Sequence, residues 1–502
     1  MDISVVTGDI TEVEADAIIV NLFKGVKRPG GATGAVDKAL GGAISGLIDD
    51  GEITGKKGEI VSIHTLGRIK PKRVVVAGLG EREKLTQDTI REIMGAVSRY
   101  LRARGVKKVA TIVHGAGIGG MDPSGAAQAI AEGSLLGLYR FDRHRAANDE
   151  DKGEIEELHI VEVDPAKVPA LESGWNRGKV MAEATMMARD MANEPANFMT
   201  PSHMADVARQ VAEDSGLELE VLEQEQMEEL GMGAILGVAK GSREPAKLII
   251  LRYKGDQDDP SRNLGLVGKG VTFDSGGISL KPAANMGEMK GDMSGGASVI
   301  AAMGAIGRLR PKVNVTGLIP ASENLPGGSA QKPGDVVKAM NGKTIEIENT
   351  DAEGRLLLAD ALSYGRKLGL SSMVDVATLT GAIVIALGHV TSGAFGNDQA
   401  LVDRVIEAGK AAGEKIWQMP LFDEYKEQNK SDVADMKNTG GRPAGSITAA
   451  QFLSEFSEDT PWVHLDIAGT FMTDKNRGYM TKGATGIPVR TLINYVLDSA
   501  AS

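Results

Sequence analysis

Two glycine-rich segments carry the charged residues whose types and spacing could do chemistry. The first reads GKGVTFDSGGISLKP over Gly268–Pro282, and MKGDM follows at Met289–Met293. The second reads NTDAEGRL over Asn349–Leu356. Each comes directly after an apolar stretch that we expect to form a strand, and open α/β sheets bind ligands where such strands end. Both segments are therefore candidates for one site.

Two carboxylates of the second segment have the spacing of a metal site. Asp351 and Glu353 are two residues apart, which places both side chains on one face of an extended segment. Carboxylates pressed together repel each other unless one takes up a proton or a divalent cation neutralises both. Arg355 follows at the same spacing and could hold an anion or a substrate carbonyl. The helix expected over Leu356–Tyr364 would turn its N-terminal amides toward the same place.

The first segment supplies the residues that could complete a two-metal site. Asp274 and Asp292 bring the candidate carboxylates to four, enough for two metals that share bridging oxygens at about 3.5–4 Å. A lysine amine can bind a metal if its pKa falls several units from ~10.4. A lysine that stays charged can instead polarise a scissile carbonyl and stabilise the oxyanion. The spacing leaves open whether Lys269 or Lys281 has each role.

A structural interpretation competes for each segment taken alone, because Asp and Glu between glycines usually form turns, caps and surface ion pairs. The combination of carboxylates, lysines and an arginine favours a metal-dependent hydrolase. The seven histidines include no HExxH motif, so a histidine-based zinc protease is unlikely, and we expect His464 to be structural. Oxygen ligands accept Mn and Mg as well as Zn, so the native metal is not defined.

Composition narrows the class of protein. The 502 residues contain 56 Lys and Arg against 68 Asp and Glu, a net charge of −12, which makes nucleic acid an unlikely main partner. The absence of cysteine excludes disulfides, thiolate nucleophiles and iron–sulfur clusters. The first residues do not resemble a signal peptide, and the longest nearly apolar stretch, Val376–Gly388, is too short to span a bilayer. We therefore expect a cytoplasmic protein with no membrane partner.

The pattern along the chain predicts two α/β domains. Short β-branched runs alternate with helical patterns, which is typical of mostly parallel sheets. The predicted strands are Ile3–Val6, Ala17–Val20, Ile60–Ile63, Arg73–Ala77, Lys108–Val113, Glu157–Val163, Leu248–Tyr253, Leu264–Val267, Asn314–Ile319 and Ser372–Ala377. The predicted helices of the first domain are Gly34–Ile48, Thr86–Arg104 and Pro123–Phe141.

A helix is expected to join the two domains. The helical stretch Ser173–Met191 stops near Pro195 and Pro201, which cannot continue a helix. The charged segment Asp142–Gly153 is expected to be a solvated loop close to the first domain's edge. We assign residues 1–165 to the N-terminal domain, 166–197 to the linking helix region and 198–502 to the catalytic domain.

The two glycine-rich segments closely resemble the signatures of the leucyl aminopeptidase family, the cytosolic aminopeptidases. The likeness extends to ARDMANEPANFMTP (Ala188–Pro201), DVATLTGA (Asp375–Ala382), AGSITAAQFL (Ala444–Leu453) and WVHLDIAGT (Trp462–Thr470). The resemblance implies an N-terminal macrodomain-like α/β domain and a larger C-terminal α/β catalytic domain with a central mixed sheet. It also implies a homohexamer that acts on peptides with a free N-terminus.

The resemblance assigns the metal ligands by position. Asp274 and Glu353 correspond to the bridging carboxylates. Lys269 and Asp292 would complete the tighter site, and Asp351 the more exchangeable one. The family pattern therefore implies two divalent ions per subunit, Mn or Zn and possibly Mg.

The resemblance also assigns the remaining roles. Lys281 becomes the electrophilic lysine, and Arg355 resembles the arginine that holds bicarbonate, the family's proposed general base. The substrate amine would bind one metal and contact Asp292, while a water activated by both metals attacks the first peptide carbonyl. The implied preference is for Leu and other aliphatic residues. The implied pocket residues are Met289, Thr378, Leu379, Gly381 and Ala468.

An alternative function uses the N-terminal domain. VTGDIT at Val6–Thr11 and DAIIVN at Asp16–Asn21 resemble the opening of a true macrodomain, and Gly30–Gly34 could form a glycine loop. Asp9 would then contact an adenine. In this alternative the chain is a regulatory or binding protein whose N-terminal domain binds a nucleotide such as ADP-ribose.

Overall fold

The computed structural model describes residues 1–146 and 153–501, which divide into two compact units. The first unit contains residues 1–183 and 475–481, and the second contains residues 184–474 and 482–502. Residues 147–152 of the loop predicted at Asp142–Gly153 lie outside the described residues. Within the described ranges, every helix lacks the length or the apolar character needed to cross a membrane.

The first unit is built on a six-stranded sheet in the order β1-β6-β5-β2-β4-β3. All neighbours are parallel except β3 and β4, which form an antiparallel hairpin. The strands are β1 (Asp2–Thr7), β2 (Ala17–Phe23), β3 (Ile60–His64), β4 (Arg73–Gly80), β5 (Lys108–Ile112) and β6 (Glu157–Glu162). The mostly parallel sheet predicted for this part of the chain is confirmed.

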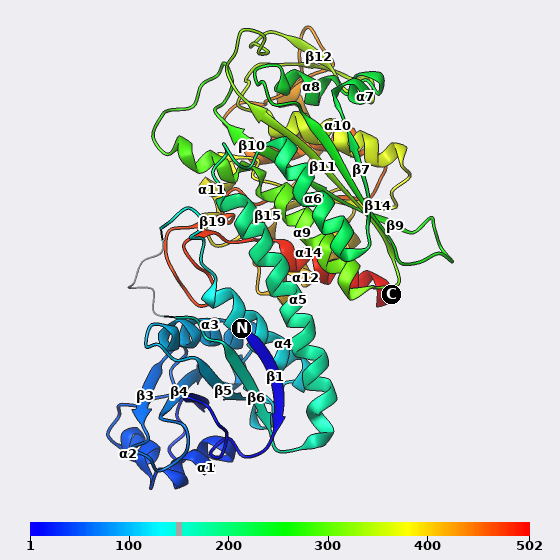
Figure 1. The fold of residues 1–502 in the computed structure, drawn as a ribbon. Coiled ribbons are helices and arrows are strands. Elements are labelled where there is room, and N and C mark those ends of the chain that lie inside the picture. Colours follow the sequence, from blue (N-terminus) through cyan, green and yellow to red (C-terminus); the bar gives the residue numbers. More distant parts are fainter. Residues whose placement is uncertain (147–152, 502) are drawn as a thin grey trace. The chain divides into compact units, whose positions relative to one another are not determined.

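Helices cover both faces of this sheet (Figure 1). Because strand side chains alternate between faces, Ile19 and Val75 pack with α3 (Gln87–Arg102) and α4 (Pro123–Leu138). Ile18 and Val74 point the other way and pack with α1 (Gly31–Ala39) and α2 (Ala43–Asp49).

The single helix predicted over Gly34–Ile48 is wrong. Gly41 and Gly42 both have left-handed backbone conformations, with φ of 71° and 85°, and they separate α1 from α2. Glycine adopts this conformation without a steric penalty, so the chain turns where a continuous helix was expected.

The predicted joining helix is α5, which runs from Val168 to Asn193 and is longer than the pattern predicts. The chain passes from the first unit to the second within this helix, between Glu183 and Ala184. It ends two residues before Pro195, whose ring and missing N–H cannot continue a helix.

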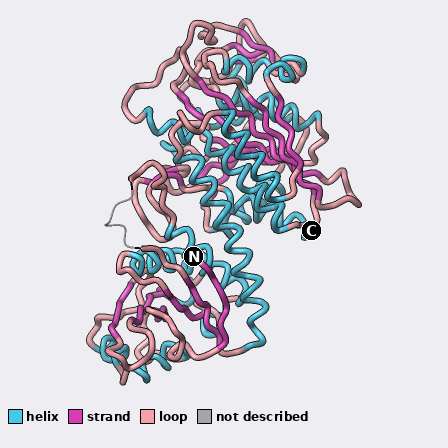
Figure 2. Tube along the Cα trace, in the orientation of Figure 1, coloured by secondary structure: helices cyan, strands magenta, loops and turns pink. Residues whose placement is uncertain are grey.

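The second unit contains a nine-stranded mixed sheet, drawn with its strands in magenta in Figure 2. Its order is β16-β15-β18-β14-β9-β11-β8-β7, and β10 pairs with β11 beside this path. The strands are β7 (Glu218–Leu222), β8 (Lys247–Lys254), β9 (Asn263–Gly268), β10 (Gly270–Asp274), β11 (Asn314–Asn324), β14 (Ser372–Ala377), β15 (Ser392–Gly396), β16 (Ile416–Gln418) and β18 (Trp462–Asp466). The central mixed sheet implied by the family resemblance is confirmed.

Two helix groups complete this unit. Helix α9 (Ser294–Leu309) packs with α6 (Pro201–Ser215) and α14 (Val489–Ala501). Helix α10 (Gly354–Lys367) packs with α8 (Gly233–Ala239) and α13 (Gly445–Ser457) in one apolar core that includes Val267 and Leu318 of the sheet.

A buried carboxylate on α10 fixes the start of α8. Asp360 Oδ2 accepts hydrogen bonds from the backbone N–H of Ala234 and Ile235, at 3.0 and 2.9 Å. Its Oδ1 accepts one from the N–H of Met340 at 2.8 Å. Burial raises the pKa of Asp360 to about 7, although these donors favour the ionised form.

We predict that Asp360 makes the stability of the chain depend on pH from about 4, the ordinary pKa of an Asp side chain, to about 7. Its folded pKa exceeds its unfolded value, so between these two values the free energy of unfolding falls by about 1.4 kcal/mol per pH unit as the pH rises, and it levels off above pH 7. Asp360→Asn does not titrate, so the melting temperature of the wild type minus that of the variant should rise as pH falls from 8 to 6. A difference that stays constant over this range would show that the three N–H groups hold the carboxylate ionised.

Candidate metal centre

The sheet of the second unit brings the two glycine-rich segments to one edge. Strands β9, β10 and β14 all run in the direction of β11, so their carboxyl ends lie together. Lys269 follows β9, Asp274 ends β10 and Thr378 follows β14. Glu353 stands at the N-terminal cap of α10. Asp292 lies in a 3₁₀ segment, Met286–Met293, which leads into α9.

Lys269 lies between two carboxylates and is almost entirely buried. Its Nζ is 2.8 Å from Asp292 Oδ1 and 2.8 Å from Glu353 Oε1. The same nitrogen donates to the carbonyl oxygen of Thr378 at 3.0 Å. One lysine therefore joins residues from three separate parts of the chain.

Lys281 joins the other two carboxylates. Its Nζ is 2.8 Å from Asp274 Oδ2 and 2.5 Å from Asp351 Oδ1. Asp274, Asp351 and Glu353 each place one carboxylate oxygen within 4.8 Å of the other two. All five predicted metal ligands and Lys281 therefore gather in one cluster, which the spacing of the sequence could only suggest.

Glycines permit this close approach. A Cβ on Gly354 would lie 2.6 Å from Cε of Lys269, and one on Gly276 would lie 2.8 Å from Asp351 Oδ1. Real Cβ atoms do not approach other heavy atoms so closely. The glycines of both motifs therefore leave room for the side chains of the ligands.

Two neutral residues orient the acidic cluster, and motif analysis missed them both. Asn324 Nδ2 donates to Asp274 Oδ1 at 2.8 Å and to the carbonyl oxygen of Thr350 at 3.0 Å. Thr350 Oγ1 donates to the carbonyl oxygen of Gly276 at 2.6 Å. Asn324 is paired with Asp274 in the register of β10 and β11. Only this pairing of strands in the folded sheet identifies Asn324 as a partner of Asp274.

The electrostatics show an excess of negative charge. Burial raises the pKa of Glu353, and repulsion from Asp274 raises it further. Burial also raises the pKa of Asp292 and of Asp351, although the lysines oppose this effect. Burial lowers the pKa of both Lys269 and Lys281, but attraction to the surrounding carboxylates outweighs it and raises the pKa of each lysine.

The donor set fits divalent cations. Asp292 Oδ2, Asp351 Oδ1 and Glu353 Oε2 are buried and make no hydrogen bond of good geometry, although lysine nitrogens lie within ion-pairing distance of the first two. Carboxylate oxygens with free lone pairs are suitable ligands for Mn, Mg or Zn. The carboxylates attract the proton of Lys269, so metal ions must displace that proton if its amine is to become a ligand.

Arg355 has the environment of an anion-binding group. It is buried, and its Nε and Nη1 have no hydrogen-bond partner in the structure. Burial lowers its pKa to about 10, although the charges of Glu353 and Asp466 oppose that change. The guanidinium group stays positively charged at neutral pH, and its free donors suit a planar oxyanion.

The predicted pocket residues lie on three segments near this cluster's ligands. Thr378 Oγ1 donates to Asp292 Oδ1 at 2.7 Å, which ties the 378–381 loop to a predicted ligand. Asp466 Oδ1 accepts from the N–H of Leu379 and from that of Ala468, at 3.1 and 3.2 Å. Gly381 begins helix α11 (Gly381–Leu387), and Met289 is half-buried in the 286–293 segment.

Asp466 is a further residue that the motifs did not reveal. Its Oδ2 accepts from Thr380 Oγ1 at 2.7 Å, so one buried carboxylate holds two of the three segments that carry the predicted pocket. His464 is fully buried, and its Nδ1 lies 2.6 Å from Asp375 Oδ1. Trp462 donates to the other oxygen of Asp375 at 2.6 Å. These contacts are those expected of a structural histidine.

The predicted adenine contact of the N-terminal unit is engaged within its own loop. Asp9 Oδ1 accepts from the backbone N–H and from Oγ1 of Thr11, both at 2.8 Å. These bonds close a turn after β1.

Comparison with known proteins gives a consistent result. The model of the cytosol aminopeptidase family's catalytic domain matches residues 186–493, and that of its N-terminal domain matches residues 19–148. A probable cytosol aminopeptidase of Solibacter usitatus is 49% identical and aligns over 99% of both chains. One from Alkaliphilus metalliredigens is 46% identical over 98% of both chains.

Solved structures agree. A mutant of tomato leucine aminopeptidase superposes with a TM-score of 0.88 at 33% identity, covering 99% of this chain and 96% of that one. A bottromycin maturation enzyme in complex with Mn superposes with a TM-score of 0.85 at 35% identity, covering 97% of this chain and 100% of the other. By sequence over its full length and by fold, this chain belongs to the cytosol aminopeptidase family and is an aminopeptidase.

Proposed function

We propose that this aminopeptidase releases Leu and other aliphatic residues from peptide N-termini by means of two divalent cations. The observation that carries the proposal is the group formed by Asp274, Asp351 and Glu353, whose oxygens lie within 4.8 Å of one another. Repulsion among these buried groups is relieved when cations are present.

The ligands we propose are the residues that share this cluster: Lys269, Asp274, Asp292, Asp351 and Glu353. The metal-dependent family and the neighbour in complex with Mn support divalent ions, with Mn, Zn or Mg as the candidates. When bound, two such ions supply Lewis acidity and a water of lowered pKa.

Two cationic side chains provide the remaining chemistry. Lys281 keeps its proton and is 22% exposed, so it can donate to a substrate carbonyl as that oxygen gains negative charge. Arg355, with two free donors, would hold a bicarbonate ion, which supplies a general base. Lys281 is thus assigned the stabilisation of the transition state, and Arg355 the binding of the proton acceptor.

Recognition of the free N-terminus falls to Asp292 and the residues around it. The carboxylate of Asp292, which contacts Thr378 of the proposed pocket, would attract a substrate amine and so restrict cleavage to the first peptide bond. We assign the side-chain pocket to Met289, Thr378, Leu379, Gly381 and Ala468, with Asp466 fixing two of its segments. An apolar pocket separates adjacent aliphatic residues only about tenfold to a few hundredfold per methylene.

We further propose that residues 198–502 carry this chemistry, that 166–197 link them to the N-terminal domain of residues 1–165, and that the cytoplasmic enzyme is a homohexamer. The name of the relatives, cytosol aminopeptidase, supports the location. Trp417 and Phe422, 65% and 64% exposed, lie at or close to the edge strand β16, and such surfaces are commonly covered by another copy.

Glu353→Ala should abolish hydrolysis of leucine amide while the melting temperature changes little. The loss of one shared carboxylate removes a ligand of both proposed ions. Activity is measured after chelation and reloading with Mn, and Glu348→Ala, which removes an exposed carboxylate five residues away, is the control. Turnover retained by Glu353→Ala after reloading would contradict the assignment.

Lys281→Ala and Asp274→Ala should separate catalysis from metal binding. We expect Lys281→Ala to lower kcat at least about a hundredfold, the size of effect seen when one oxyanion donor is removed, with metal content intact. Asp274→Ala should lose bound metal. Metal content is measured by elemental analysis after gel filtration, and equal loss in both variants would show that the roles are confused.

Chelation should remove activity, and Mn, Zn or Mg added singly should restore it to different extents. With each metal, the p-nitroanilides of Leu and Met should be cleaved at least about tenfold faster than those of Lys and Glu, because the predicted pocket is apolar. Equal rates for charged and aliphatic substrates would exclude the proposed pocket.

A further inference from the structure

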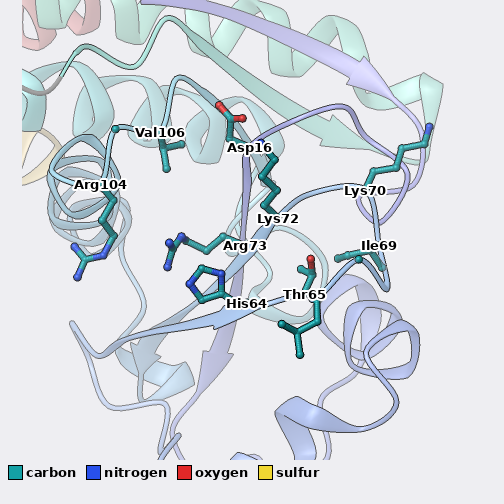
Figure 3. A pocket seen from close by; sticks show the side chains of 12 residues that line it. Asp16, His64, Thr65, Ile69, Lys70, Lys72, Arg73, Arg104 and Val106 are labelled. Atoms are coloured by element: carbon teal, nitrogen blue, oxygen red, sulfur yellow. The ribbon is translucent and has the colours of Figure 1, made fainter.

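The N-terminal unit contains a hollow that the aminopeptidase chemistry does not use. It has a volume of about 470 Å³, within the range of small-molecule sites. Figure 3 shows it between the turn that joins β3 to β4 and the segments that begin β2 and follow α3. The lining residues are Asp16, His64, Thr65, Leu66, Gly67, Ile69, Lys70, Lys72, Arg73, Arg104, Gly105 and Val106.

The hollow is lined by four Lys and Arg side chains, and of these Lys70 alone has a carboxylate partner among the described residues, Glu12 at 4.0 Å. Lys72 has no ion pair among the described residues. Arg73 donates to Ser62 Oγ at 3.0 Å, and Arg104 donates to the carbonyl oxygen of Tyr100 at 3.0 Å. The one lining carboxylate, on Asp16, accepts from the backbone N–H groups of residues 107 and 108. In a chain with a net charge of −12, this local excess of positive charge is unusual.

The backbone holds these cations in place. Arg73, the first residue of β4, is paired with His64 at the end of β3 and with Ala17 at the start of β2. It therefore lies where the ends of three strands meet. The N–H of Thr65 donates to the carbonyl oxygen of Lys72 at 3.1 Å and closes the hairpin neck. In Figure 3 the side chains of Arg73 and His64 lie close together in the middle of the hollow.

The rim carries a strained apolar residue. Leu66 has a φ of 54°, a left-handed conformation that is sterically unfavourable for a residue other than glycine. Its side chain is 89% exposed, so packing in the described structure does not compensate for that strain. Strained residues often mark ligand sites. Leu66, together with Ile69, gives the hollow an apolar edge beside its cations.

We propose that this hollow binds a small anion that carries two or more phosphoryl groups and a flat apolar ring, the chemistry of a nucleoside diphosphate. The fork of Arg73 suits phosphate oxygens, Lys72 and Arg104 add charge, and Leu66 and Ile69 contact the ring. The hollow lies at the amino ends of β2 and β4, the end of the parallel sheet opposite the Asp9 turn. It is therefore a different site from the glycine-loop site considered from the sequence.

The test is calorimetric titration of the full-length protein with ADP, inorganic pyrophosphate and adenosine at low ionic strength. ADP should bind most tightly, pyrophosphate more weakly because it lacks the ring, and adenosine undetectably because it lacks charge. Lys72→Gln and Arg104→Gln should each weaken ADP binding at least fivefold, and Arg73→Lys at least tenfold. Added salt should weaken binding by all variants.

Matched controls identify the site. Lys38→Gln removes an exposed cation of the same unit outside the hollow and should leave ADP binding unchanged. Aminopeptidase activity should be equal in all of these proteins, which shows that they are folded. The proposal is overturned if neither ADP nor pyrophosphate binds, if the Lys72 and Arg104 variants bind ADP like the wild type, or if a DNA duplex binds while pyrophosphate does not.

Discussion

The second unit depends on one electrostatic constraint: four acidic side chains must be held together in a buried place. Asp274, Asp292, Asp351 and Glu353 come from separate segments, and only Asp351 retains substantial exposure. Two lysines neutralise part of their charge, yet burial still raises the pKa of Glu353. Removing charges from water without full pairing destabilises a fold, and such clusters persist where a cation or a reaction requires them.

The surrounding architecture follows from that requirement. Strands β9, β10 and β14 run parallel to β11, so their carboxyl ends converge, and glycines leave space for long side chains beside the backbone.

A second set of contacts keeps the acidic cluster in one arrangement. Asn324 donates hydrogen bonds to Asp274 and to the carbonyl oxygen of Thr350, and the hydroxyl group of Thr350 donates to a backbone carbonyl oxygen nearby. These bonds restrict the rotation of the Asp274 carboxylate. Asp466 does the same for the loops that begin at Leu379 and Ala468. A metal site needs its ligands fixed before the metal arrives, because the outer contacts decide which lone pairs point inward. Asn324, Thr350 and Asp466 are therefore as much a part of the candidate site as the acidic cluster that they orient.

The sequence predicts most strands and the residues of the acidic cluster because those signals are local. Runs such as Ala17–Val20 and Ser372–Ala377 alternate with helical patterns, and NTDAEGRL places its charges at fixed spacing. Gly41 and Gly42 show where local pattern fails: the apolar spacing continues across them, but their left-handed backbone ends one helix and starts another.

Asn324 could not be predicted, since its role exists only once β11 has paired in register with β10. The hollow of the N-terminal unit was missed for the same reason. Its cations are far apart in the sequence and come together at a hairpin neck.

The acidic cluster and the N-terminal hollow both contain charged groups without full pairing, negative in the first and positive in the second. A folded chain usually pairs the charges that it brings together, as most surface lysines of this protein do with neighbouring acids. In the acidic cluster, oxygens of Asp292, Asp351 and Glu353 remain without good hydrogen bonds despite two lysines, so the excess charge is negative. In the N-terminal hollow, Lys72, Arg73 and Arg104 have no carboxylate partner among the described residues, so the excess charge is positive. Acidic residues outnumber basic ones in this chain, which has a net charge of −12, so carboxylates are plentiful enough to pair with these cations. That the fold leaves them unpaired beside an exposed, strained leucine is the reason to look for an anion there.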